Sequence, residues 1–135
     1  DIRVVAQRLT ADNAEEILSG HDVVVDCTDN YATRYLIDDC CGRLAIPMVY
    51  GTAEQMGGQV SAFHTACSGS YRALYPQEPE QLAEVGVFPP MVGLVGSIQA
   101  LETLKLLCGM ESELEGVLLT VDGVSLQFSR FEIGR

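Results

Sequence analysis

The segment that decides the fold occupies residues 23–34 and reads Val-Val-Val-Asp-Cys-Thr-Asp-Asn-Tyr-Ala-Thr-Arg. Residues 22–27 form a short apolar run without alternation, which predicts a strand that is covered on both faces. A polar turn of Thr28, Asp29 and Asn30 follows this strand. Ligands of open α/β sheets bind outside the carboxyl ends of the strands. The turn is therefore a candidate ligand site.

The residues around this segment predict alternating strands and helices. Residues 2–9 alternate enough for a strand, and an Ala-rich stretch at 11–19 predicts a short helix. Residues 31–45 carry apolar side chains at i and i+4, which predicts a longer helix. Two further strands are expected, one at 47–50 and an antiparallel one at 59–64, after a Gly-Gly break.

The second half of the chain predicts a different connectivity. Residues 66–89 are rich in Pro, Gly and Ser and predict a long irregular crossing. Residues 90–108 predict the longest helix, which opens at a proline in the favoured first turn. A hairpin with an Asp-Gly turn follows, with strands at 117–121 and 124–133. The predicted fold class is α/β: the second half of a Rossmann-like doubly wound sheet with a mixed antiparallel C-terminal extension.

Composition and charge exclude several classes of protein. The chain has 135 residues, 47% of them hydrophobic, which is enough for the core of one domain. Its net charge of -11 argues against nucleic acid and against anionic membrane surfaces, since both require clustered cations. The single lysine, Lys105, and seven scattered arginines would bind a triphosphate poorly without a metal ion or basic groups from elsewhere. We expect neither a nucleic-acid nor a membrane partner.

The five cysteines indicate a reduced protein. Their number is odd, the chain contains no C-x-x-C, and two of them are adjacent, so we expect a cytoplasmic protein without disulfides. Cys67 falls in the predicted crossing and could be an exposed thiol. The others are most simply interpreted as small core residues. These are Cys27, Cys40, Cys41 and Cys108.

The polar turn after residue 27 has two interpretations. In the first, Asp and Asn occupy it because their side chains bind free backbone N–H groups at the start of a helix. In the second, Asp29 holds Mg²⁺ that bridges nucleotide phosphates, since magnesium prefers carboxylate and phosphate oxygens. Arg34, one helical turn further on, could face the same side of the turn.

Three motifs carry a resemblance to a known family. The chain reads Asp-Cys-Thr-Asp-Asn-x-x-x-Arg at 26–34 and Gly-Gly-Gln-Val at 57–60. A third motif, Gly-Val at 86–87, leads into Gly-x-x-Gly-Ser-x-Gln-Ala-x-Glu at 93–102. In this order the motifs resemble the ThiF/MoeB/HesA adenylyltransferases, bacterial relatives of ubiquitin-activating enzymes. The resemblance runs from about residue 4 to residue 132 and covers the second half of that family's catalytic domain.

The resemblance implies a reaction. Members bind ATP and Mg²⁺ and adenylate the C-terminal glycine of a ubiquitin-like sulfur-carrier protein of the ThiS or MoaD type, for thiamine or molybdopterin biosynthesis. The carboxylate of the carrier attacks the α-phosphate of ATP, and pyrophosphate leaves. Members also form homodimers. Phosphoryl-type transfer requires positioning and charge neutralisation more than covalent chemistry from the protein.

The resemblance also assigns site residues. Asp29 matches the aspartate that binds metal and nucleotide, and is expected to be catalytic. Thr28 and Asn30 would contact the nucleotide, and Arg34 would act catalytically near the incoming C-terminus. The chain contains neither G-x-G-x-x-G nor a Walker-type loop. We therefore expect residues 1–135 to be a single partial domain that lacks the glycine-rich nucleotide-binding half and is inactive alone.

Two departures from the family argue against further sites. Zinc-binding members carry Cys-Tyr-Arg-Cys where this chain reads Ser-Tyr-Arg-Ala at 70–73, so structural zinc is not expected. Residues 81–84, where some members place a reactive cysteine, contain none. His64 and Cys67 show an H-x-x-C spacing, but two ligands do not make a metal site.

Two alternatives remain open from the sequence. The chain could be a non-catalytic module that only dimerises or binds a ubiquitin-like tail, and a weaker possibility is a sulfur relay through Cys67. The helix at 90–108 could be a core helix, part of a dimer interface, or both. Gly93 and Gly96 within it would allow close packing.

Overall fold

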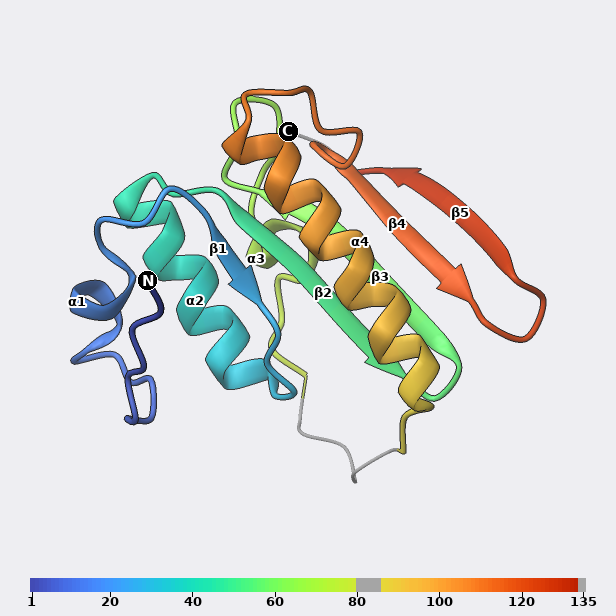
Figure 1. Ribbon diagram of the computed structural model, residues 1–135, viewed down its shortest axis with the longest axis horizontal. Helices are drawn as coiled ribbons and strands as arrows, with labels where there is room; N and C mark the ends of the chain where they lie inside the picture. Colours follow the sequence, from blue (N-terminus) through green and yellow to red (C-terminus); the bar gives the residue numbers. More distant parts are fainter. Residues whose placement is uncertain (80–85, 134–135) are drawn as a thin grey trace.

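The structure is a computed structural model that describes residues 1–79 and 86–133 (Figure 1). Nine elements follow one another along the chain. They are α1 (Ala14–Leu18), β1 (Val24–Asp26), α2 (Tyr31–Leu44), β2 (Met48–Glu54), β3 (Gly57–Phe63), α3 (Tyr71–Leu74), α4 (Pro89–Leu107), β4 (Val117–Asp122) and β5 (Gln127–Glu132). The alternation of helices and strands confirms the predicted α/β class.

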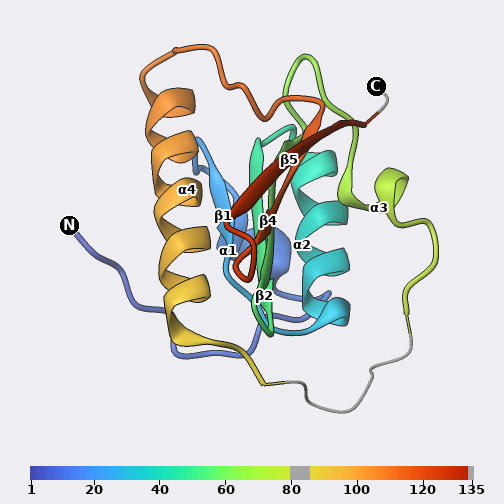
Figure 2. The same ribbon diagram turned by 90° about the vertical axis from the view of Figure 1, so that its right-hand side faces the viewer.

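The strands form one mixed sheet in the order β1-β2-β3-β4-β5. Strands β1 and β2 are parallel, with α2 as the crossover between them, and every later pair is antiparallel. Helix α4 covers one face of the sheet, whereas α2 and α3 lie on the other (Figure 2). The parallel pair with its crossover helix is the expected Rossmann-like part, and β3 to β5 are the expected antiparallel extension.

The core is divided between the two faces of the sheet. One cluster lies under α2 and α3 and includes Met48, Phe63 and Tyr71. The other lies under α4 and includes Val60 and Val95. Alternation along β2 and β3 sends successive side chains to opposite faces, which explains how two strands supply both clusters.

Two glycines let α4 approach the sheet closely. A Cβ atom on Gly58 would lie 2.6 Å from Cγ2 of Val95, and one on Gly51 would lie 2.2 Å from Cδ of Gln99. Gly93 and Gly96 on the helix do not have this role, because a Cβ atom on either would meet no described atom within 4 Å. Both positions face away from the sheet, so the close packing expected there is not made with the sheet and stays a prediction for a dimer interface.

The strand predicted at 2–9 is wrong. These residues take no strand conformation, and the side chains of Ile2 and Val4 are 93% and 82% exposed. Alternation alone does not make a strand, because the backbone also needs a hydrogen-bonded neighbour. None of the described strands pairs with this segment.

Other boundaries shift by a few residues. Helix α1 begins at Ala14, three residues later than predicted, and β2 continues past the expected end at residue 50 to Glu54. The crossing at 66–89 contains the short helix α3. Its start is capped by Ser70, whose Oγ accepts a hydrogen bond from the backbone N–H of Ala73 at 3.0 Å. Residues 81–84, which contain no cysteine, lie outside the described residues.

The cysteines divide differently from the prediction. Cys40 and Cys41 are fully buried in α2, as expected, and Cys67 is exposed. Cys27 and Cys108 are also exposed, which corrects their assignment to the core. Both stand where an element ends, Cys27 directly after β1 and Cys108 at the C-cap of α4. At the end of an element, a side chain lies beyond the neighbouring helices and strands that would otherwise cover it.

Helix α4 has two apolar faces. Met91 and Val95 are buried against the sheet, which agrees with the interpretation as a core helix. Leu101, Leu104 and Leu107 are more than half exposed on another side. Of the helices that the structure describes, none has both the length and the apolar composition of a membrane span.

Candidate functional site

The turn after β1 is built around a buried ion pair. The side chain of Asp26 is fully buried, and its Oδ2 accepts a hydrogen bond from Nε of Arg34 at 2.7 Å. Its Oδ1 accepts two more, from the backbone N–H of Thr28 at 2.9 Å and from the Thr28 hydroxyl at 2.6 Å. A buried carboxylate requires such partners, since an unpaired charge is strongly disfavoured in the interior. Asp26 therefore fixes the start of the turn.

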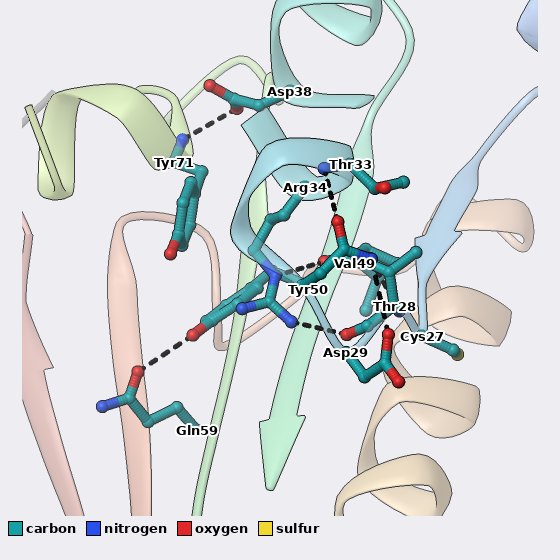
Figure 3. Close-up of polar contacts among 12 residues, drawn as sticks. Cys27, Thr28, Asp29, Thr33, Arg34, Asp38, Val49, Tyr50, Gln59 and Tyr71 are labelled. Atoms are coloured by element: carbon teal, nitrogen blue, oxygen red, sulfur yellow. Dashed lines mark hydrogen bonds and ion pairs between the residues drawn. The ribbon is translucent and has the colours of Figure 1, made fainter. Parts of the chain in front are cut away.

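Arg34 connects the turn to the aromatic side of the sheet. Its Nη2 donates to the backbone oxygen of Thr28 at 2.7 Å, and its guanidinium carbon lies 5.0 Å from the centre of the Tyr50 ring (Figure 3). Burial acts to lower the pKa of Arg34, but the neighbouring Asp26 carboxylate raises that pKa above its ordinary value. The predicted catalytic arginine is thus a fully charged group that holds Asp26 and Thr28 in place.

Thr28 and Asn30 are engaged within the turn. The Thr28 hydroxyl is bound to Asp26, and Oδ1 of Asn30 accepts from the backbone N–H of Thr33 at 2.9 Å. Asn30 is therefore the N-cap of α2, as the structural interpretation of the turn expected. Their predicted contact with a nucleotide stays a prediction.

Asp29 differs from its neighbours. Its side chain is exposed, and among the described residues the carboxylate accepts one long hydrogen bond, from Nδ2 of Asn30 at 3.4 Å. Its free lone pairs suit a hard cation whose other ligands are phosphate oxygens and water. The described residues contain no group of three or more His, Cys, Asp or Glu side chains placed to hold a metal ion by themselves. A magnesium ion at Asp29 would therefore need ligands from the nucleotide.

A pocket of about 730 Å³ opens beside Arg34 on the face of the sheet opposite α4. Arg34 lies at the β1 side of this pocket, and strands β2 to β5 contribute its floor. Gln59 on β3 lines it near the middle. Four of the five tyrosines of the chain also line it, namely Tyr31, Tyr50, Tyr71 and Tyr75. The geometry thus joins the polar turn to a tyrosine-rich cavity.

Helix α3 is held over this pocket by one buried carboxylate. Oδ1 of Asp38 accepts from the backbone N–H of Tyr71 at 2.8 Å and lies 2.8 Å from Nε2 of His64. Oδ2 accepts from the backbone N–H of Arg72 at 3.0 Å. His64 is thus bound to Asp38, and Cys67 is exposed. The carboxylate therefore fastens the start of α3.

Some site residues were missed from the sequence. The role of Asp26 could have been predicted from the sequence. An aspartate side chain can accept hydrogen bonds from the residue two positions later and so stabilise a turn. Gln59 lay within a motif but had no assigned role. The tyrosines come from α2, β2, α3 and the segment after α3, so no local pattern joins them.

Comparison with known proteins identifies the family. Residues 1–135 match the family model described as "ThiF family". The chain belongs to this family. It is 40% identical over 131 residues to "Adenylyltransferase and sulfurtransferase MOCS3" of Culex quinquefasciatus, which covers 93% of the chain and 30% of that relative. It is also 40% identical over 138 residues to "Sulfur carrier protein adenylyltransferase" of Thermus thermophilus, covering 95% of the chain and 51% of that relative.

Solved structures show the same fold. Escherichia coli MccB with ATP superposes with a TM-score of 0.82 at 12% identity, over 97% of this ThiF-family chain and 42% of MccB. PaaA superposes with a TM-score of 0.69 at 11% identity, over 92% of the chain and 46% of PaaA. The chain spans between 30% and 51% of the length of the curated relatives described above.

Proposed function

We propose that these residues are part of an ATP-dependent adenylyltransferase that activates the C-terminal glycine of a ubiquitin-like sulfur-carrier protein. The observation that carries this proposal is the exposed carboxylate of Asp29 at the carboxyl end of β1, on a turn that the Asp26–Arg34 ion pair fixes. Two relatives at 40% identity are named adenylyltransferases, and one of them is named for a sulfur carrier. These names disfavour the non-catalytic module.

In the proposed reaction, an oxygen of the carrier's terminal carboxylate bonds to the α-phosphorus of ATP. The bond from that phosphorus to the bridging oxygen breaks, and pyrophosphate leaves with its electron pair. Asp29 would hold Mg²⁺ against the phosphates, and the ion would supply positive charge to the oxygens on which negative charge builds up. Thr28 and Asn30 would contact the nucleotide mainly through the backbone of the turn, because their side chains are engaged within it.

Arg34 would act beside the reacting groups. Its Nε and Nη2 are bound to Asp26 and Thr28, while Nη1 makes no hydrogen bond among the described residues. Because Arg34 lines the pocket, Nη1 is the group available to the carrier's carboxylate. The remaining residues of the pocket would receive the extended C-terminal segment of the carrier.

Several properties of the whole protein belong to the same proposal. The glycine-rich residues that cradle the phosphates would lie outside residues 1–135, which form one part of the catalytic domain. The exposed leucines of α4 would take part in a homodimer. The protein would act in the cytoplasm, in thiamine or molybdopterin biosynthesis, without structural zinc.

The test is carrier-dependent exchange of labelled pyrophosphate into ATP by the full-length protein. We expect exchange with a ThiS- or MoaD-type carrier that ends in Gly-Gly, and none with a carrier that lacks its last glycine. Omission of Mg²⁺ should abolish the exchange. Absence of exchange with both carrier types, while ATP still binds, would refute the proposed activity.

A further inference from the structure

The floor of the pocket contains a side-chain amide of fixed orientation. Oε1 of Gln59 accepts a hydrogen bond from the hydroxyl of Tyr50 at 3.0 Å (Figure 3). It accepts another from the hydroxyl of Tyr75 at 3.0 Å. A carbonyl oxygen has two lone pairs, and both are used. The oxygen is therefore held on the side of the two tyrosines.

The fixed oxygen leaves two donors free. Nε2 of Gln59 carries two N–H groups and makes no hydrogen bond within the described part of the chain, and Gln59 lines the pocket. In the observed orientation both tyrosine hydroxyls donate to the one oxygen, so the two N–H groups of the amide point away from them. The amide thus offers neutral donors to the cavity before any ligand arrives.

Charge varies along the strands that floor the pocket. Arg34 lies at one end, beside Tyr50, whereas the carboxylates of Glu54 on β2 and Asp122 on β4 both lie in the row of Gly57 at the other end. Gln59, two residues from Gly57 on β3, lies in the row between these ends. An anionic group is favoured near Arg34 and disfavoured near Asp122. The middle of the pocket suits a neutral, acceptor-rich group, and the carbonyl oxygens of an extended peptide are of this kind.

We propose that the amide of Gln59, oriented by Tyr50 and Tyr75, donates to a main-chain carbonyl of the carrier's C-terminal segment and sets the affinity for that segment. The inference rests on the proposed function, and it adds a binding residue to that site. The terminal carboxylate would then point toward Arg34, because the positive charge at that end of the pocket favours an anion.

The decisive variant is Gln59→Glu in the full-length protein. A glutamate oxygen still accepts from both tyrosines, but the side chain loses its N–H donors and gains a negative charge. We expect the KM for the carrier to rise by about tenfold or more, as for a lost hydrogen bond to a buried acceptor. The KM for ATP should stay within about twofold, because the proposed nucleotide site lies at the turn of residues 28–30 and does not include this amide.

A matched control separates the loss of donors from the added charge. Gln127→Glu places the same charge on β5 in the same pocket, away from the tyrosine pair. It should raise the KM for the carrier by less than Gln59→Glu does. The pair Tyr50→Phe and Tyr75→Phe should raise the KM for the carrier by a few-fold, because the amide then rotates freely.

Direct binding distinguishes failure of this inference from failure of the proposed function. A hexapeptide ending in Gly-Gly is titrated against the wild-type full-length protein and Gln59→Glu by calorimetry. Weaker binding to the variant supports the inference, even if the wild-type protein shows no pyrophosphate exchange. Equal binding to both proteins, an unchanged carrier KM, or a parallel rise in the KM values for carrier and ATP would overturn it.

Discussion

Two polar clusters border the same pocket and are built in opposite ways. The charged cluster joins Asp26 to Arg34, eight residues apart, and every hydrogen bond of the Asp26 carboxylate comes from residues 28–34. The neutral cluster joins Gln59 to Tyr50 and Tyr75, which come from β2 and from the segment after α3. Within the described residues the first cluster satisfies both oxygens of its carboxylate and leaves only Nη1 of Arg34 without a partner, whereas the second leaves both N–H groups of its amide without one.

The two clusters therefore differ in role: the charged cluster mainly positions the turn, and the neutral cluster mainly recognises the ligand. A buried ion pair that loses one partner leaves an uncompensated charge, so the Asp26–Arg34 pair holds the turn rigidly and directs the remaining nitrogen of Arg34 into the pocket. A neutral amide that is held only through its oxygen carries no charge. Its N–H groups can therefore exchange water for a ligand at a smaller cost in free energy. We therefore expect substitutions in the charged cluster to affect stability most, and those in the neutral cluster to affect ligand affinity.

The largest effect is expected from Arg34→Gln. Removal of the guanidinium leaves the carboxylate of Asp26 buried without a counter-ion, which should cost about 3–5 kcal/mol of the free energy of unfolding. Urea unfolding of the full-length protein measures this loss. Arg130→Gln is the control, because its pair with Glu113 is exposed and should contribute about 1 kcal/mol or less. Equal losses in the two variants would mean that burial of the ion pair is unimportant.

Asp29→Asn should leave stability nearly unchanged and strongly reduce the rate of adenylation. Its carboxylate is exposed and has one long contact, so the free energy of unfolding should change by about 0.5 kcal/mol or less. The rate of adenylation should fall by about 10²–10³-fold, the usual consequence of losing one electrostatic group at a reacting centre. Pyrophosphate exchange and thermal unfolding of the same preparation give both numbers. Asp22→Asn, an exposed carboxylate before β1, should keep the wild-type rate.

Tyr50→Phe and Tyr75→Phe should have smaller effects on stability than Arg34→Gln. Each variant loses one neutral hydrogen bond to Gln59, which is worth about 0.5–1.5 kcal/mol. Because both hydroxyls bind one oxygen, the two losses should not be additive in the double variant. Tyr31→Phe is the control, since its hydroxyl makes no hydrogen bond among the described residues. Additive losses would show that the hydroxyls act independently of a shared acceptor.

The smallest effect concerns alkaline pH. Burial raises the pKa of Tyr71 from 10.0 to about 12, and nearby Arg34 acts in the opposite direction. The folded state therefore keeps its proton where the unfolded chain loses it, so stability is fully present below pH 10 and decreases up to about pH 12. Tyr71→Phe should make the pH dependence of the free energy of unfolding shallower across this window. An unchanged slope would place the alkaline sensitivity elsewhere.

Much of the fold could be predicted because its signals are local. The sequence predicts a helix at 31–45, and α2 spans Tyr31–Leu44. The agreement is close because the N-cap and the apolar spacing of this helix both lie within its own sequence. The strand predicted at 2–9 is absent, because a strand is stabilised by a hydrogen-bonded neighbour, and the sequence of the segment itself does not supply one. Gly93 and Gly96 illustrate the same limit, because spacing along a helix does not say which face meets the sheet.

The sequence by itself determined the turn of residues 26–34, where Asp26, Thr28 and Asn30 bind partners within eight residues of themselves. It also determined the acidic character of the chain and the motifs that place it in its family. Only the tertiary structure brought Gln59 against its two tyrosines and opened the pocket beside Arg34. The physical reason is that hydrogen bonds between distant segments depend on strand order and register, which no single stretch of sequence encodes.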